Sequence, residues 1–216
     1  YTFRVRTIAR YADRAGDWSD YSDENTVTER QVSNNGNGSW IQNQYGWWYR
    51  YYDGGYPSNT WEKINNTWYY FNRDGYMLNG WQQISSSWYY LGANGAMTRG
   101  WQSVNGRWYY MNGDGVMLTG WQYIGGRWYF LDGSGAMLTG WQFINGAWYF
   151  LDGSGAMLTG WQFINGHWYY MNDSGIMLTG WQFINGSWYY LDGSGAMYAD
   201  QTTPDGYYVD GSGKRN

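Results

Sequence analysis

The sequence predicts an all-β protein, a β-solenoid of stacked β-hairpins with a 20-residue repeat. Two tryptophans seven positions apart recur in register seven times, from Trp61/Trp68 to Trp181/Trp188. A fixed period of this kind is typical of arrays in which each unit contacts only its neighbours. Aromatic and β-branched runs also flank dipeptides such as Asn145-Gly146, a strong signal for a hairpin with a type I′ turn. Because a lone hairpin is marginally stable in water, the copies must stack to bury their faces.

Residues 141–160 illustrate how one repeat is expected to fold. With Asn145-Gly146 as the loop, Trp148 lies opposite Phe143. Cross-strand partners share a face, and faces alternate along each strand. One face therefore carries Trp141, Phe143, Trp148 and Phe150, and the other carries Gln142, Ile144, Tyr149 and Leu151. Residues 152–155 form a second turn that leads towards the next copy, and we expect the core to be a ladder of Ile, Leu, Met and aromatic contacts along the stack.

The chain divides into five expected segments. Residues 1–6 alternate apolar and polar, and the aromatic stretch 18–22 precedes a second strand-like piece, 25–28. This pairing resembles the last two strands of a fibronectin type III domain, with Tyr1 in the place of its corner tyrosine, so we expect residues 1–33 to be the remnant of such a domain. Residues 34–39 are a linker, 40–60 an atypical first repeat, 61–200 seven regular repeats and 201–216 a closing repeat. The whole is expected to be an internal fragment of a longer exported protein.

The composition excludes several classes of protein. Aromatic residues make up 23% of the chain and charged residues 14%, compared with about 25% charged residues in an average domain. A disordered acidic chain would lack the aromatic residues. The net charge of −4 provides no basic surface for nucleic acid. The chain has no cysteine for a disulfide or a thiolate metal site, and no apolar run approaches the roughly 20 residues of a membrane span.

No residue pattern predicts an enzyme, a cofactor or a metal site. His167 is the only histidine, and no carboxylate pair recurs as acid–base catalysis would require. Asp132, Asp152 and Asp192 occur in Asp-Gly-Ser-Gly segments, where turn formation explains them better than calcium binding does.

The repeat points to a family. Gly80-Trp81, Trp88-Tyr89-Tyr90 and Gly95-Ala96-Met97 recur in register, and the match extends from about residue 40 to residue 216. The pattern resembles the choline-binding, or cell-wall-binding, repeat of Gram-positive surface proteins and phage lysins. The resemblance implies a β-solenoid that holds the cholines of teichoic acid between successive hairpins, in a secreted protein of the bacterial cell surface.

The ring pattern suits a quaternary ammonium ion. A trimethylammonium group has no hydrogen-bond donor, whereas an aromatic face attracts it by about 0.5–2 kcal/mol per ring. Two indoles of one hairpin and one ring of the next would form three walls of a cage. By the face argument, the third ring is the residue two positions after the second tryptophan of the next repeat. The tyrosines one position earlier, from Tyr69 to Tyr189, are interpreted as structural.

Seven ring sets follow from this argument. They are Trp61, Trp68 and Tyr90; Trp81, Trp88 and Tyr110; Trp101, Trp108 and Phe130; Trp121, Trp128 and Phe150; Trp141, Trp148 and Tyr170; Trp161, Trp168 and Tyr190; and Trp181, Trp188 and Tyr208. An eighth set, Trp40, Trp48 and Tyr70, needs a one-residue insertion. Polarizable methionine sulfurs are expected to close the cage floors, at Met97, Met117, Met137, Met157 and Met177. Packing alone would tolerate Leu, Ile or Val, yet tryptophan holds all fourteen regular positions.

The sequence thus predicts a non-catalytic, multivalent module that attaches a larger protein to choline-bearing teichoic or lipoteichoic acid. The first alternative is a carbohydrate-binding array that stacks its rings on glucan faces. The second is a structural stalk or dimerisation element. Two partners stay open, another wall polysaccharide and a second copy of the chain joined through terminal hairpins. The scarcity of polar side chains beside the rings favours choline over sugar.

Overall fold

The computed structural model describes residues 37–215 as two units, divided between Leu78 and Asn79. Each unit is built from antiparallel two-stranded hairpins. Residues 37–215 contain no helix, hence none long and apolar enough to span a membrane. The predicted fibronectin-like remnant and residues 34–36 of the predicted linker lie outside the described residues.

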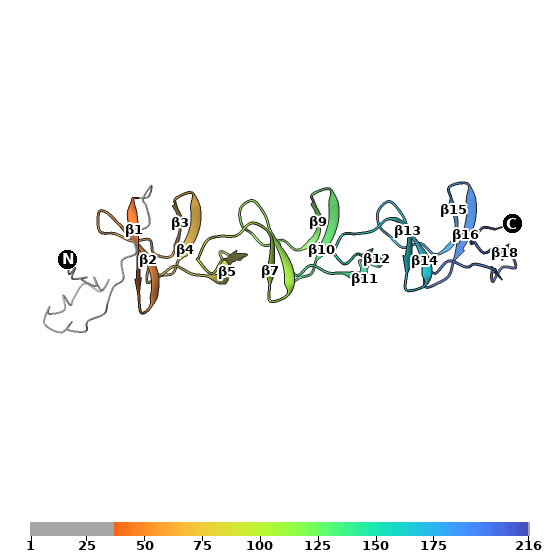
Figure 1. The fold of residues 1–216 in the computed structure, drawn as a ribbon, viewed down its shortest axis with the longest axis horizontal. Coiled ribbons are helices and arrows are strands. Elements are labelled where there is room, and N and C mark those ends of the chain that lie inside the picture. Colours follow the sequence, from red (N-terminus) through yellow and green to blue (C-terminus); the bar gives the residue numbers. More distant parts are fainter. Residues whose placement is uncertain (1–36, 216) are drawn as a thin grey trace. The chain divides into compact units, whose positions relative to one another are not determined.

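Eighteen strands pair as nine hairpins (Figure 1). The first unit holds β1 (Gly38–Asn43) with β2 (Gly46–Tyr51), and β3 (Thr60–Ile64) with β4 (Thr67–Phe71). The second unit holds β5 (Gly80–Ile84) with β6 (Ser87–Leu91), β7 (Gly100–Val104) with β8 (Arg107–Met111), β9 (Gly120–Ile124) with β10 (Arg127–Leu131), β11 (Gly140–Ile144) with β12 (Ala147–Leu151), β13 (Gly160–Ile164) with β14 (His167–Met171), β15 (Gly180–Ile184) with β16 (Ser187–Leu191), and β17 (Gln201–Thr202) with β18 (Tyr208–Val209). The predicted fold class is confirmed.

The register within each regular hairpin is the predicted one. In β11–β12, Trp148 pairs with Phe143 and Phe150 pairs with Trp141. The loop residues Asn145 and Gly146 have φ angles of 50° and 85°, as a type I′ turn requires at both central positions. The faces assigned from the alternation are therefore those of the folded hairpin.

In the second unit, the segment that follows each hairpin from β7–β8 onward connects it to the hairpin before. After β11–β12, the Met157 amide donates to the Trp128 carbonyl of β10 at 2.8 Å, and Ala156 bridges to Tyr129. Met157 also bridges back to Leu151 of its own hairpin. A short third strand thus pairs with both hairpins, which supplies the partner that an isolated hairpin lacks.

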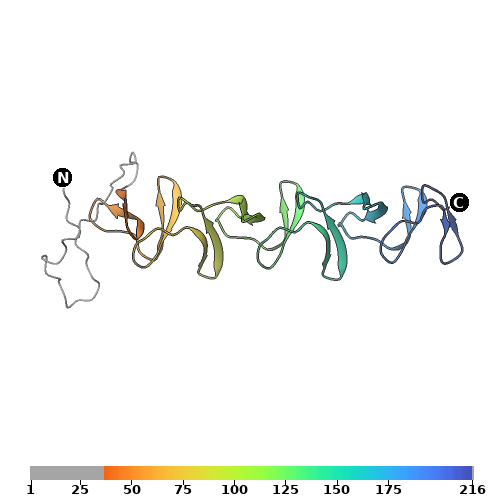
Figure 2. The same cartoon turned by 60° about the horizontal axis from the view of Figure 1, so that its bottom comes forward.

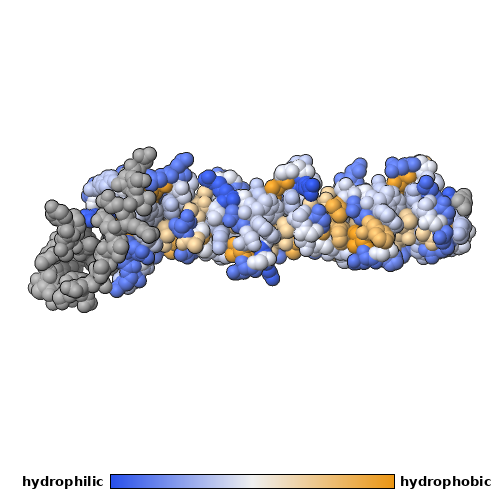
Figure 3. Space-filling view, in the orientation of Figure 1, coloured by the Kyte–Doolittle hydropathy of each residue, from blue (hydrophilic) through white to orange (hydrophobic). Residues whose placement is uncertain are grey.

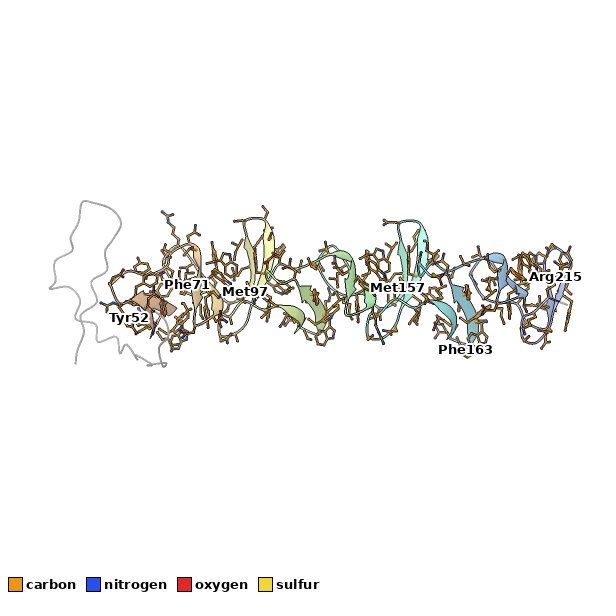
Figure 4. The ribbon with its side chains drawn as sticks, turned by 90° about the horizontal axis from the view of Figure 1, so that it is seen from above. Tyr52, Phe71, Met97, Met157, Phe163 and Arg215 are labelled. Carbon is orange, nitrogen blue, oxygen red and sulfur yellow. The ribbon has the colours of Figure 1, made fainter. Side chains whose placement is uncertain are left out.

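The core of the second unit is a ladder of single side chains. The last residue of the second strand of each regular hairpin is fully buried at 0% exposure: Leu91, Met111, Leu131, Leu151, Met171 and Leu191. Met97 and Met157 lie near the middle of the molecule in Figure 4, whereas Phe163 lies at its edge. The apolar interior therefore runs along the stack, as the repeat predicts.

Successive hairpins of the second unit point in different directions. The β9–β10 and β15–β16 hairpins point the same way in Figures 1 and 2, although three repeats separate them. In Figure 2, β5–β6 and β11–β12 share another direction. The direction of a hairpin thus returns after three repeats, so neighbouring hairpin tips face different parts of the surroundings.

The glycine that ends each Asp-Gly-Ser-Gly turn has a packing role. Gly155 has a φ of +85°, and a Cβ there would lie 2.3 Å from the Met137 sulfur. The left-handed conformation costs a non-glycine residue about 1–2 kcal/mol, and an added methyl group would also push Met137 off the turn. We therefore expect Gly155→Ala to lower the free energy of unfolding by at least about 2 kcal/mol, measured by urea denaturation.

Two neighbouring glycines provide matched controls. A Cβ on Gly160 meets no atom within 4 Å although φ is +72°, so Gly160→Ala isolates the backbone cost. Gly153 has neither a positive φ nor a close neighbour, so Gly153→Ala should be nearly neutral. If Gly155→Ala and Gly160→Ala lowered the free energy of unfolding by the same amount, the contact between Gly155 and Met137 would contribute nothing to stability.

Candidate functional site

Paired indoles form an open corner on the hairpins of the second unit. In five hairpins the ring centroids of the two tryptophans are 6.3–6.5 Å apart and their planes meet at 82–87°. The second tryptophan of each pair from Trp88 to Trp188 is 41–46% exposed. The two indoles therefore make adjacent walls that solvent can reach, and they are not buried against each other.

A third ring comes from the next hairpin. Its centroid lies 4.8–4.9 Å from the first tryptophan of the preceding hairpin, at an interplanar angle of 60–69°. The contacting pairs are Trp81–Tyr109, Trp101–Tyr129, Trp121–Tyr149, Trp141–Tyr169 and Trp161–Tyr189. Each of these five first tryptophans thus receives one tyrosine from the next hairpin.

This tyrosine is not the ring predicted from the sequence. The predicted rings instead contact the first tryptophan of their own hairpin, at 5.1–5.3 Å. These contacts involve Tyr90, Tyr110, Phe130, Phe150, Tyr170 and Tyr190. At the end of the array, Tyr207 and not the predicted Tyr208 lies against Trp181, at 5.9 Å.

The physical reason is the sense in which the hairpins stack. The prediction took the third ring from the face of the next hairpin that carries its own tryptophans. The hairpins instead stack front to back, so the tryptophan face of one hairpin meets the opposite face of the next. Tyr149 lies on that opposite face, because its cross-strand partner is Gln142. Tyrosines interpreted as structural are therefore the ones that reach the preceding indoles.

The opening hairpin of the first unit is a packed cluster. Trp40 contacts Tyr49, Tyr69 and Phe71 at 5.3, 4.8 and 5.8 Å, and Tyr49 and Phe71 are buried. Trp47 holds the second tryptophan position, since its carbonyl accepts the Met77 amide. The predicted set of Trp40, Trp48 and Tyr70 is therefore wrong in two members. The set of Trp61, Trp68 and Tyr90 draws on both units and stays a prediction.

The methionines pack against turns. The sulfurs of Met97, Met117, Met137, Met157 and Met177 lie 2.3–2.5 Å from the point that a Cβ would occupy on the glycine of the next turn. Amide–carbonyl bonds fix the backbone of the last four next to a second tryptophan: Met117 to Trp88, Met137 to Trp108, Met157 to Trp128 and Met177 to Trp148. The predicted part of these sulfurs in a cage floor stays a prediction.

A fourth ring is present in four of the hairpins, and the predicted sets omit it. Tyr123, Phe143, Phe163 and Phe183 are 61–62% exposed, and each centroid lies 5.2–5.3 Å from the second tryptophan across the hairpin. Lys63, Gln83 and Ser103 hold this position in the first three regular repeats. The alternation along the strands already placed these rings on the same face as the two tryptophans, so the sequence alone could have indicated them. Figure 3 shows hydrophobic residues as separate patches of the visible surface.

Charge is sparse at the rings, except beside Trp181. The Trp181 indole N–H donates to Asp205 Oδ2 at 2.8 Å, and the Thr203 hydroxyl donates to Asp205 Oδ1 at 2.6 Å. The hydrogen bond from Thr203, then that from Trp181, holds the pKa of the Asp205 carboxyl below its ordinary value. A carboxylate with a lowered pKa adds stability above about pH 4, and this is lost as the pH falls through the lowered pKa.

Residues 37–215 hold no group of three or more metal-ligating side chains.

Comparisons with known proteins agree on one family. A family described as a choline-binding repeat matches residues 58–99, 98–139, 118–159, 138–170 and 158–201. Choline binding protein F from Streptococcus pneumoniae, solved in the presence of a peptidoglycan analogue, is 40% identical with a TM-score of 0.74, and the match covers 79% of this chain and 61% of that one. CbpJ from Streptococcus pneumoniae is 38% identical with a TM-score of 0.74, over 82% of this chain and 63% of that one.

A third similar structure is that of a modular enzyme. The autolysin LytC from Streptococcus pneumoniae is 32% identical with a TM-score of 0.53, and the match covers 78% of this chain but 44% of that one. No curated protein sequence matches the chain. The repeat matches together extend over residues 58–201, and the paired indoles recur through this span in the same register. The chain therefore belongs to the choline-binding repeat family.

Proposed function

We propose that the chain is a non-catalytic attachment module whose ring sets hold the cholines of teichoic or lipoteichoic acid between successive hairpins. The observation that carries the proposal is the recurring corner of two perpendicular, solvent-accessible indoles next to a tyrosine of the following hairpin. Three aromatic faces around one open position suit a cation that has no hydrogen-bond donor.

We propose five sets of walls, each supported by the contact of its tyrosine with the first tryptophan. They are Trp81, Trp88 and Tyr109; Trp101, Trp108 and Tyr129; Trp121, Trp128 and Tyr149; Trp141, Trp148 and Tyr169; and Trp161, Trp168 and Tyr189. The originally predicted rings, such as Phe150, support the first tryptophan of their own hairpin edge-on. They thus hold a wall from the side, as its cross-strand partner, and we assign the methionine sulfurs to the floors.

Weak binding at each site is part of the proposal. Choline has few heavy atoms, and solvent-open sites fall well below the ceiling of about 1.5 kcal/mol per heavy atom. A binding free energy of about −4 kcal/mol corresponds to a dissociation constant near 1 mM. A polymer that presents many cholines to linked sites gains about 10²–10⁴ in avidity. Repetition would then provide the retention that one site does not.

The setting that we propose is the bacterial cell surface, where the module would attach the rest of a longer secreted protein to the wall. The three structural relatives are longer than the aligned region, since the match covers 61%, 63% and 44% of their chains. The activity of the whole protein is therefore a separate question from that of the repeats. Sugar binding is the competing function, because exposed rings such as Phe163 also suit stacking on a sugar face.

Calorimetric titration with three ligands tests this function. Choline is expected to bind with a dissociation constant on the order of 1 mM. Its uncharged carbon isostere, 3,3-dimethylbutan-1-ol, should bind at least about 10-fold more weakly, because it has the same shape without the cation–π attraction. A soluble glucan should give no heat. Equal affinity for choline and the isostere, or binding of the glucan alone, would reject the proposal.

A further inference from the structure

The last ring set of the second unit contains a cation of the chain itself. The guanidinium carbon of Arg215 lies 3.6 Å from the ring centroid of Tyr207 and 5.6 Å from that of Trp181. Figure 4 labels Arg215 at this end of the molecule. These rings hold the places that Tyr189 and Trp161 hold in the preceding set. A positive charge thus stands over two rings of the kind proposed to bind choline.

Arg215 arrives there because it takes the position of a methionine. The Met157 and Met197 amides donate to the carbonyls of Trp128 and Trp168, and the Arg215 amide donates to that of Trp188 at 2.9 Å. Five positions separate Asp192 from Met197, and the same spacing separates Asp210 from Arg215. The same backbone position therefore carries a neutral thioether at the earlier junctions and a guanidinium at this one.

The surrounding groups are arranged for this cation. The centroids of Trp181 and Tyr207 are 5.9 Å apart, compared with 4.8–4.9 Å in the five regular pairs. Asp205 accepts the indole N–H of Trp181 at 2.8 Å, which fixes the ring and brings a carboxylate to the same corner. The charge of Arg215 in turn helps to keep the pKa of Asp205 below its ordinary value, after the hydrogen bonds from Thr203 and Trp181.

We propose that Arg215 occupies the cation position of the set formed by Trp181, Trp188 and Tyr207, so that this set holds the closing segment and does not take choline. The inference rests on the proposed function of the other sets. A tethered group with an effective concentration of about 10 mM exceeds by about 10-fold the dissociation constant near 1 mM expected for a cation in such a set, so the set is open in about one molecule in ten. The apparent affinity of a site falls by the fraction of molecules in which it is open. We expect choline to bind this set at least about 10-fold more weakly than its neighbours.

Indole N–H resonances provide a site-resolved test on the full chain. The Trp161 and Trp181 signals are assigned by comparison with Trp161→Phe and Trp181→Phe variants, and choline is then titrated into three proteins. In the wild type, Trp161 should respond near 1 mM and Trp181 at concentrations at least 10-fold higher. In Arg215→Met, which places the usual residue at this junction, both should respond together. Lys214→Met removes a neighbouring charge of the same sign and should behave as the wild type does.

The outcomes separate this inference from the function on which it rests. If Trp161 and Trp181 of the wild type respond with the same midpoint, the inference is overturned and the function stands. If no indole responds to choline, the function fails, and the position of Arg215 is then judged without ligand. Its δ-methylene protons should be shifted upfield by the Tyr207 ring, and this shift should be absent in Tyr207→Leu. The same measurement decides the question if Arg215→Met does not fold. In either situation, an Arg215 signal without the upfield shift would overturn the inference.

Discussion

Removing the two central repeats, residues 121–160, is expected to weaken binding to a choline-bearing polymer by about 100-fold. An effective concentration of about 10 mM acting on sites with a dissociation constant near 1 mM gives a factor of about 10 for each linked site. Affinity for free choline per site should stay unchanged. The comparison is made by surface-immobilised teichoic acid binding for the polymer and by calorimetry for choline.

The repeat offers a clean junction for this deletion. Joining Gly120 to Trp161 recreates the existing Gly160-Trp161 link, and the two glycines have φ angles of 73° and 72°. The matched control retains all repeats but carries Trp128→Leu and Trp148→Leu, which remove one wall from each of two sets. Its polymer binding should fall to a similar degree. Undiminished polymer binding by the shortened chain would mean that one strong site is responsible, and multivalency would then be wrong.

Replacing Tyr149 by leucine is expected to weaken choline binding at the Trp121 and Trp128 pair by about 3- to 30-fold, the equivalent of one cation–π contact. Tyr149 lies 4.9 Å from Trp121, and Phe150 lies 5.1 Å from Trp141. Phe150→Leu should therefore act on its own hairpin and alter the response of Trp148. Choline titrations followed through the indole N–H signals of Trp128 and Trp148 measure the two effects separately.

This pair of variants distinguishes two stacking geometries. The sequence alone predicted that the tryptophan face of one hairpin meets the tryptophan face of the next. If that were so, Phe150→Leu would weaken choline binding at the Trp128 site and Tyr149→Leu would leave it unchanged. That result would contradict the front-to-back arrangement. Urea denaturation of both variants serves as the control, because each substitution also removes an edge-on ring contact.

The sequence was sufficient to predict structure within a hairpin. The loop at Asn145-Gly146 fixes the register, and the register fixes which side chains share a face. The relation between hairpins could not be obtained in this way, because alternation says which residues lie together on a face but not which face the next hairpin presents. The choice between Tyr149 and Phe150 depended on that relation. It was settled by how the segment after each hairpin pairs with the preceding one.

The ends of the array show a second limit of the repeat pattern. At the opening, Trp47 and not Trp48 accepts the equivalent backbone bond. Trp47 follows Trp40 by the regular seven positions and pairs with Gln42, as Trp88 follows Trp81 and pairs with Gln83. At the closing end, Asp210 forms the same turn as Asp192, and five positions further on Arg215 takes the place of Met197. The replacement of methionine by Arg215 in an otherwise strict series was therefore visible in the sequence as a sign that this set differs from the others.

The changing direction of the hairpins has a consequence for the geometry of anchoring. Only hairpins three repeats apart in the second unit, such as β9–β10 and β15–β16, face the same way. A flat layer of ligand touching one side would engage those hairpins and leave the ones between them unused. Full use of the proposed sites requires polymer strands on every side, as inside a brush of flexible chains. Anchoring by the second unit would then be insensitive to rotation of that unit about its stacking direction, and its strength would depend on how deeply the unit is embedded.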